Sequence, residues 1–306
     1  MAGCLLCPRQ CGAQRTETYG RGFCQVGTLP VVSRAAAHFW EEPCISGVRG
    51  SGTVFFSGCS LRCVFCQNAP ISHQPQGQRL TVRQLAELLA RVEDLGVHNI
   101  NLVNPSHFGP AVLEALALRR PSIPVVWNSS GYETCALVES ARGLVDIFLP
   151  DFKYASRESA DSLAAAPDYF DTALAAIQAM CAQTGGPVYS EEGILLRGTL
   201  VRHLALPLRT SESIAILNTI AQELPAGTPV SLMRQYTPMN GATAQGLHRR
   251  LTPREYARVR QHMEALGLPG YTQQKDAADS AYTPPFMDEE SLRLFPNTEA
   301  GENIIQ

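Results

Sequence analysis

Residues 53–68 read Thr53-Val54-Phe55-Phe56-Ser57-Gly58-Cys59-Ser60-Leu61-Arg62-Cys63-Val64-Phe65-Cys66-Gln67-Asn68. The first five residues predict a short strand that ends at a loop. Three cysteines follow in that loop, Cys59, Cys63 and Cys66, with the spacing C-x3-C-x2-C. Three thiolates this close can hold three irons of a cubane 4Fe–4S cluster, which normally takes four cysteines. One iron then keeps an open coordination position, and open positions mark metal sites that perform chemistry.

The same spacing also suits a zinc site with a distant fourth ligand, because spacing alone does not select the metal. The rest of the chain favours a cluster on an α/β scaffold. Six strand and helix patterns alternate after Gly52, and the predicted strands are residues 53–57, 99–104, 123–128, 145–151, 195–204 and 230–235. The predicted helices are residues 81–95, 109–119, 133–143, 158–183 (irregular at Pro167), 212–224 and 252–266.

Alternating strands and helices predict right-handed βαβ units and a parallel sheet. Six units are too few for a closed eightfold barrel, so we expect an α/β fold, a partial (β/α)6 barrel of parallel strands over residues 49–275. Ligands of such sheets lie at the carboxyl ends of the strands. A small Cys-rich, metal-binding N-terminal module is expected over residues 1–48, and a surface tail over residues 276–306.

Composition excludes several classes of protein. The chain has 306 residues, 45% of them hydrophobic, which is enough for a sizeable core. The formal net charge of −3 gives no basic surplus for nucleic acid. No signal peptide and no apolar run long enough to span a membrane are apparent. Eight of the ten cysteines precede residue 70 at close spacing, which is typical of metal ligands in a reducing cytosol, so we expect a cytoplasmic protein.

A second set of cysteines lies near the N-terminus, and we name it the N-terminal cysteine group: Cys4, Cys7, Cys11 and Cys24. Four thiolates suffice for a closed site, which takes either zinc or an auxiliary 4Fe–4S cluster. The sequence leaves both metals open. Cys44 is a substitute ligand or a small apolar residue, and Cys181, in a predicted helix, is expected to be a core thiol.

The cysteine loop, with Phe65 directly before its third cysteine, resembles the signature of radical S-adenosylmethionine (radical SAM) enzymes. Further motifs extend the resemblance over residues 1–270 to a branch similar to pyruvate formate-lyase activating enzymes: Cys4-x2-Cys7-Pro8-Arg9-x-Cys11, Glu41-Glu42-Pro43, Asp151-Phe152-Lys153, Arg202-His203-Leu204 and Gln235-Tyr236. The resemblance implies a 4Fe–4S cluster whose open iron is chelated by S-adenosyl-L-methionine (SAM). It also implies reductive cleavage of SAM to a 5′-deoxyadenosyl radical that abstracts hydrogen.

The same resemblance implies roles for residues at the strand ends. Phe65 is expected to flank the adenine, and Lys153 of the Asp-x-Lys motif to meet the SAM carboxylate, as a compact point charge can. Where many radical SAM enzymes have Gly-Gly-Glu after the second strand, this chain has Asn104-Pro105-Ser106-His107. The other residues expected to hold SAM are Asn104, Ser129, Arg202 and Tyr236. His203 should point away from Arg202 if their strand is regular.

The leading functional prediction is hydrogen abstraction that activates a glycyl radical enzyme, with flavodoxin or ferredoxin as the electron donor. One alternative is radical SAM modification of a small molecule or a peptide. Another alternative, from a different class, is a non-catalytic iron–sulfur or zinc-binding protein.

Overall fold

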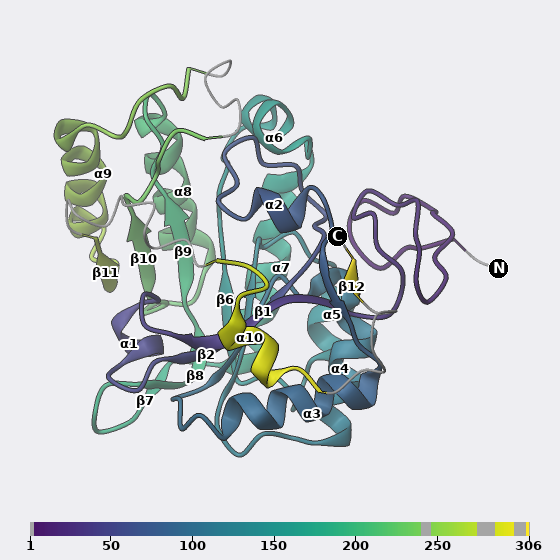
Figure 1. Ribbon diagram of the computed structural model, residues 1–306. Coiled ribbons are helices and arrows are strands. Elements are labelled where there is room, and N and C mark those ends of the chain that lie inside the picture. Colours follow the sequence, from purple (N-terminus) through teal and green to yellow (C-terminus); the bar gives the residue numbers. More distant parts are fainter. Residues whose placement is uncertain (1–2, 240–245, 274–284, 297–303, 306) are drawn as a thin grey trace.

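The computed structural model describes residues 3–239, 246–273, 285–296 and 304–305. Figure 1 shows helices arranged around a central set of strands, with the N-terminal loop at the right edge of the view. The strands are β1 (Val31–His38), β2 (Ser51–Phe56), β3 (Gly77–Arg79), β4 (Ile100–Val103), β5 (Val125–Ser129), β6 (Ile147–Pro150), β7 (Val188–Tyr189), β8 (Leu195–Thr199), β9 (Val201–Leu204), β10 (Val230–Met233), β11 (Gly270–Thr272) and β12 (Ile304–Ile305).

The helices include one short 3-10 turn, η1. They are α1 (Pro43–Ser46), α2 (Ala69–Ser72), α3 (Val82–Glu93), η1 (Ser106–Phe108), α4 (Gly109–Leu118), α5 (Cys135–Ser140), α6 (Arg157–Ala164), α7 (Tyr169–Thr184), α8 (Thr210–Glu223), α9 (Pro253–Ala265) and α10 (Glu289–Leu294). The break between α6 and α7 falls at Pro167, as predicted, because proline disrupts a helix interior.

The described strands form two sheets. The larger has the order β12-β3-β1-β2-β4-β5-β6-β8-β7, and the smaller has the order β11-β10-β9. The five neighbours from β2 to β8 are paired in parallel, and so are β9, β10 and β11. The predicted α/β fold with a parallel sheet is therefore confirmed. The partial barrel remains a prediction.

The predicted strand 195–204 is divided in the structure. β8 pairs with the first half of β6, while β9 pairs with β10. The chain beyond β6 still meets β9, because Asp151 and Arg202 form a parallel bridge and the amide of Phe152 donates to the carbonyl of Arg202 at 2.7 Å. This junction brings the end of β6 and the start of the small sheet together at the residues that line the central cavity.

Local signals fixed the helix ends correctly. α3 begins with a complete capping box between Thr81 and Gln84, and α9 with one between Thr252 and Glu255. Each box satisfies backbone amides that the first helical turn leaves unpaired. The apolar stripe of α3, formed by Leu85, Leu88, Leu89 and Val92, is fully buried.

Two large hydrophobic clusters form the core. One packs α3, α4 and α5 against the strands from β1 to β5. The other packs α6 to α9 around β9 and β10, and it includes Leu61 and Phe65 of the cysteine loop. The loop is thus anchored by apolar contacts on the helical side. Cys44 and Cys181 are both buried core residues, as expected for small apolar side chains.

Two segments differ from the sequence-based picture. β1, whose residues show no periodic pattern, runs antiparallel to β2 and adds the residues of the predicted N-terminal module to the main sheet. The expected surface tail is packed in its described part: α10 contacts β1, Phe295 is buried, and Arg34 pairs with Asp288. The rest of that segment, apart from β12, lies outside the described residues. No helix among the described residues has the length and apolarity needed to cross a bilayer.

Candidate functional site

The cysteine loop, defined here as residues 57–68, leaves the carboxyl end of β2. Gly58 begins it at φ +82, a left-handed conformation that glycine adopts at little cost. The backbone of the loop is held by two hydrogen bonds, from the amides of Arg62 and Val64 to the carbonyls of Ala164 and Leu163 at the end of α6. The loop is therefore fixed between β2 and α6.

Each of the three loop thiols has a hydrogen-bond donor beside it. The amide of Leu61 donates to Cys59 Sγ at 3.3 Å, and the hydroxyl of Tyr154 donates to Cys63 Sγ at 3.5 Å. Cys66 Sγ lies 3.3 Å from the hydroxyl of Ser72. Donors of this kind stabilise thiolates and tune the potential of iron–sulfur clusters, so the donor set fits such a cluster.

Burial keeps the free thiols neutral. It raises the pKa of Cys59 to about 12 and the pKa of Cys63 to about 11. Because metal ligation needs thiolates, binding must release these protons. Lys153 opposes the burial penalty at Cys63 and is the main positive charge acting on that thiol.

A cavity of about 480 Å³ opens beside the loop. Its walls come from the loop, from the ends of β6, β9 and β10, and from the segment that joins β1 to α1. The size lies within the range of small-molecule and cofactor sites. The lining residues of chemical interest are Cys63, Phe65, Cys66, Glu41, Glu42, Asn128, Asp151, Lys153, Arg202 and Tyr236.

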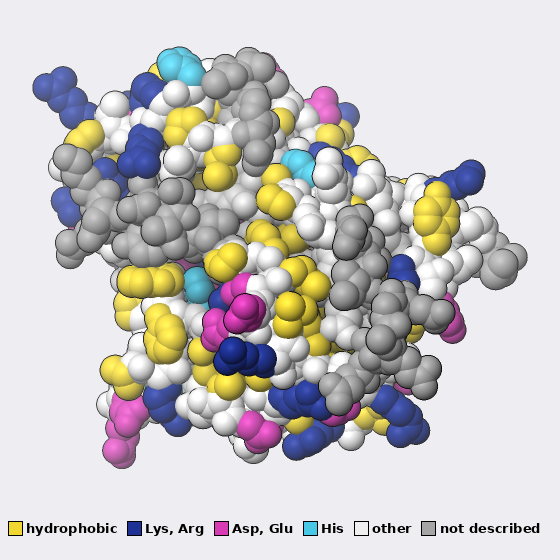
Figure 2. All heavy atoms as spheres, viewed as in Figure 1, with side chains coloured by type: hydrophobic (Ala, Val, Ile, Leu, Met, Phe, Trp, Pro, Cys, Tyr) yellow, Lys and Arg dark blue, Asp and Glu magenta, His cyan; other side chains and the backbone are white. Residues whose placement is uncertain are grey.

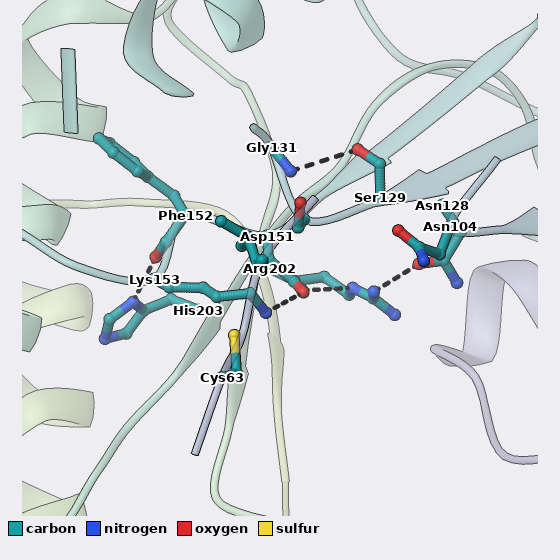
Figure 3. A network of polar contacts seen from close by, with 12 residues as sticks. Cys63, Asn104, Asn128, Ser129, Gly131, Asp151, Phe152, Lys153, Arg202 and His203 are labelled. Carbon is teal, nitrogen blue, oxygen red and sulfur yellow. Dashed lines mark hydrogen bonds and ion pairs between the residues drawn. The ribbon is translucent and has the colours of Figure 1, made fainter. Parts of the chain in front are cut away.

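A polar network crosses this cavity (Figure 3). Lys153 Nζ pairs with Asp151 Oδ2, and Arg202 Nε donates to Asp151 Oδ1 at 3.0 Å. The guanidinium of Arg202 also donates to Asn128 Oδ1 at 2.5 Å and to Glu41 Oε2 at 3.3 Å. The network runs from Lys153, beside the cysteine loop, to Glu41, which follows β1. Asp151 and Arg202, which lie between Lys153 and Glu41 in this network, each have two oppositely charged partners.

The carboxylates of the cavity have opposite pKa shifts. Burial alone would raise the pKa of Asp151, but Arg202 and Lys153 hold it below its ordinary value. Burial raises the pKa of Glu41 and of Glu42, and Arg202 only partly opposes this. Asp151 is therefore held in its ionised form by its two cationic partners, whereas burial favours the protonated form of the two glutamates.

Comparison with known proteins connects this geometry to a family. The family model described as "Radical SAM superfamily" matches residues 53–190, which include the cysteine loop. A solved radical SAM methyltransferase from Sphaerobacter thermophilus has a similar fold, with a TM-score of 0.52 and 16% identity over 72% of this chain. These findings support the radical SAM superfamily.

The curated relative is less informative. The chain is 28% identical to an uncharacterized protein of Methanocaldococcus jannaschii over 278 residues, which cover 87% of this chain and 75% of the relative. The chain spans 65% of the length of the Sphaerobacter methyltransferase, and that likeness concerns the fold alone. The superfamily implies a 4Fe–4S cluster and SAM.

The cavity brings together four of the six residues predicted to hold SAM: Phe65, Lys153, Arg202 and Tyr236. The rings of Phe65 and Tyr236 meet edge to face with centroids 5.8 Å apart, and the hydroxyl of Tyr236 is occupied by the carbonyl of Leu247 at 2.6 Å. The ring of Tyr236, rather than its hydroxyl, is therefore the part that can contact a molecule in the cavity. His203 points away from the cavity, as predicted, and hydrogen-bonds Phe152 and Ser213.

The other two predicted residues have local partners. Asn104, at φ +58, turns its amide back to the carbonyl of Gly58 at 2.7 Å, with its oxygen 3.7 Å from Cys59 Sγ. Ser129 accepts from the amide of Gly131 at 3.3 Å. Neither residue lines the cavity. Asn104 supports the first cysteine, and Ser129 supports the turn after β5, so their binding of SAM remains a prediction.

Sequence reasoning missed the carboxylates. The sequence places Asp151 two residues before Lys153 in the Asp-x-Lys motif, but no neighbouring residue indicates the ion pair between Asp151 and Arg202. Glu41 and Glu42 precede the first predicted strand, and only the antiparallel pairing of β1 with β2 brings them to the cavity. Glu133 is buried and accepts from Ser106 at 2.5 Å behind the cavity wall. Its sequence signal was weak, since it follows the third strand rather than the second.

The N-terminal cysteine group converges on a different and much smaller cavity of about 10 Å³. His107 lies at its edge and donates from Nε2 to the carbonyl of Ser57 at 2.7 Å, so Nε2 carries the proton there. The cysteine loop and the N-terminal cysteine group therefore line two separate cavities.

Proposed function

We propose that this protein is a radical SAM enzyme that reductively cleaves SAM and abstracts hydrogen from a substrate. The observation that carries the proposal is the cysteine loop, whose second and third cysteines line a cavity together with Lys153 and Asn128. A 4Fe–4S cluster held by the three loop cysteines would supply the electron that splits SAM into methionine and a 5′-deoxyadenosyl radical, and this radical would take a hydrogen atom from the substrate.

The residues of the chain bind and orient SAM. Cys59, Cys63 and Cys66 hold the cluster. Lys153, whose pKa stays above its ordinary value because of Asp151, remains charged and pairs with the SAM carboxylate. Asn128 is 3% exposed and is held by Arg202 and Glu41, which fixes its amide for hydrogen bonds to the cosubstrate.

The aromatic wall protects the radical. Phe65 is 7% exposed and packs against Tyr154 and Tyr236, so the adenosyl group has an apolar surface beside the cluster. Such a wall excludes water from the reacting centre. The same apolar contacts tie the loop to the second core cluster, which limits loop movement during the reaction.

The test is anaerobic. The protein is loaded with iron and sulfide, reduced with dithionite and incubated with SAM, and 5′-deoxyadenosine is measured by chromatography. We expect 5′-deoxyadenosine from the native protein and from Cys135→Ala, whose cysteine is exposed on α5, and none from Cys63→Ser. A fully loaded cluster that yields no 5′-deoxyadenosine would favour the non-catalytic iron–sulfur protein.

The proposed target is the glycine of a partner glycyl radical enzyme, with reduced flavodoxin or ferredoxin as the electron source. The surface around α1 supports a macromolecular target, because Phe39, Trp40 and Val48 are 53%, 62% and 88% exposed. Hydrophobic side chains gather over α1 in Figure 2. Trp40 also lines the cavity, so this apolar surface continues to its opening. Clustered exposed apolar residues are typical of protein interaction sites.

Electron paramagnetic resonance tests this target. Mixing the reduced protein and SAM with a glycyl radical enzyme encoded beside it should produce a glycyl radical signal, and Phe39→Ala, on the same surface but outside the cavity lining, should weaken the signal while 5′-deoxyadenosine formation without partner stays unchanged. Absence of the signal together with hydrogen transfer to a small molecule or peptide would favour the alternative radical SAM modification.

A further inference from the structure

Residues 3–27 lack the usual sources of stability. They contain no helix or strand beyond an isolated bridge between Arg15 and Gly20. Apart from three glycines, their buried residues are Cys24 and Val26. A segment this short and this exposed does not hold one conformation by hydrophobic burial, and small modules of this kind are normally cross-linked by disulfides or metals.

Tight backbone turns nevertheless bring the N-terminal cysteine group together. The amide of Cys4 donates to Ala13 at 2.9 Å, and the amide of Gly12 donates to Cys4 at 3.1 Å, which closes a loop around the first three thiols. Gly22 lies against two of the sulfurs: a Cβ there would be 3.3 Å from Cys11 Sγ and 3.9 Å from Cys24 Sγ. All four thiols are free, and all four line the 10 Å³ cavity.

We propose that the N-terminal cysteine group is a closed four-thiolate metal site that holds residues 3–27 against the cysteine loop. The site takes a thiophilic metal, as zinc or as an iron–sulfur cluster. In the described parts of the chain no three His, Cys, Asp or Glu side chains are already arranged around a metal ion, and this holds for the cysteine loop too. Metal binding therefore requires the four thiols to move closer together, and the backbone turns of residues 3–27 limit this movement.

Two polar groups around the cavity point to the same occupant. Arg15 is aimed at the group, with its guanidinium 3.7 Å from Cys4 Sγ, and it is fixed by the carbonyls of Val26 and His107 at 3.1 and 2.9 Å. A fixed cation suits a site of four negative thiolates. The ring of His107, 2% exposed, has a buried Nδ1 with no partner among the described residues. Because Nε2 carries the proton, this Nδ1 holds a free lone pair, and a neutral imidazole in this form is able to bind a metal ion.

Three contacts connect the site to the cysteine loop. Arg9 Nε donates to the carbonyl of Ser60 at 2.8 Å, and its guanidinium lies 3.8 Å over the ring of Phe23. In return, Arg62 of the loop donates to the carbonyl of Phe23 at 2.7 Å. The backbones also touch, since a Cβ on Gly58 would lie 2.6 Å from the carbonyl oxygen of Cys24. Order in residues 3–27 is therefore transmitted to both sides of Cys59.

The first experiment counts metal without using activity. A full-length variant with Cys59, Cys63 and Cys66 all changed to Ala is purified anaerobically, and zinc, iron and acid-labile sulfide are measured per chain. We expect one zinc, or about four irons with sulfide, to remain, and to be lost when Cys7→Ser and Cys24→Ser are added. A folded triple variant that binds no metal under reconstitution with either zinc or iron and sulfide overturns the proposal.

The second experiment tests the bracing of the loop in the otherwise native chain. Cys7→Ser with Cys24→Ser should make residues 3–27 sensitive to limited proteolysis and should speed chelator removal of iron from the cysteine loop at least several-fold. Cys135→Ala is the matched control and should change neither rate. An unchanged rate of iron loss overturns the bracing, and a failure of SAM cleavage alone bears only on the proposed function, because neither measurement requires SAM.

Discussion

The cysteine loop and the N-terminal cysteine group use the same side chain in opposite settings. The loop has three thiols, follows a parallel strand and opens onto a cavity of about 480 Å³ lined by charged residues. The N-terminal group has four thiols, lies in a segment without regular structure and surrounds about 10 Å³. Metal sites with an open position do chemistry, whereas closed four-ligand sites are structural.

Cysteine spacing indicates metal binding, whereas the surrounding fold determines whether the metal has a catalytic or a structural role. The loop is held by β2, α6 and the second core cluster. The N-terminal group has no such support, so the metal proposed for it would contribute to folding itself, as in other small metal-bound modules. Four predictions test this difference between the cysteine loop and the N-terminal cysteine group.

The largest expected effect is loss of the open site. Cys63→Ser should abolish 5′-deoxyadenosine formation to the background of the assay, because the hydroxyl is a poor iron ligand and the cluster is lost. Metal bound by the N-terminal group should be unchanged. Combined metal analysis and product chromatography measure both, and loss of all metal in this variant would contradict the separation of the two sites.

The next effect concerns the charges of the open site. Lys153→Met should weaken SAM binding roughly 10- to 100-fold, since a charge-assisted hydrogen bond contributes about 1.5–3 kcal/mol. The cluster spectrum should be retained. Equilibrium binding of SAM to the reconstituted protein gives the affinity, and Arg197→Met, which removes an exposed cation on β8, is the control. Equal affinities for the two variants would remove Lys153 from the site.

A third prediction concerns the contact between the two regions. Gly58→Ala places a Cβ 2.6 Å from the carbonyl oxygen of Cys24 at φ +82, whereas Gly143→Ala has a similar φ of +76 with nothing within 4 Å. Both variants have the left-handed strain, and only the first has the clash. We expect Gly58→Ala to lower the free energy of unfolding by about 1–3 kcal/mol more than Gly143→Ala, as overpacking typically does. Equal losses in urea titrations would mean that the contact is unimportant.

The smallest effect lies in α10, which contacts neither cysteine set. Burial opposes ionisation of Asp288, but its hydrogen bonds to Ser291 and its pairing with Arg34 lower its pKa below the ordinary value of 3.8. The ion pair therefore stabilises α10 above that value and is lost as the pH falls through the lower folded pKa.

Because Asp288 is partly exposed, the contribution at neutral pH is about 1 kcal/mol or less. Hydrogen exchange of α10 measured from pH 6 downward should show no change until below pH 4, and Asp288→Asn should exchange faster at pH 6. Metal content should be unaffected. A loss of metal in this variant would show that α10 also supports a cysteine site.

The local parts of the fold were predictable. The capping boxes at Thr252 and Thr81 and the break at Pro167 depend on residues close in the chain, and the alternation of strands with helices indicated a parallel sheet. The division of the predicted strand 195–204 was not predictable, because it depends on two distant pairing partners: its first half pairs with β6 and its second half with β10. The same is true of α10, whose burial depends on β1.

The residue pattern alone indicated the chemistry of this protein: three thiols spaced for an incomplete cluster, four more whose spacing predicts a metal site, and a lysine two residues after an aspartate. These are properties of adjacent residues. Tertiary structure alone decided the surroundings of that chemistry. Arg202 meets Asp151, Asn128 and Glu41 because three strands and the segment after β1 end at one cavity, and pairings between distant residues leave no local pattern.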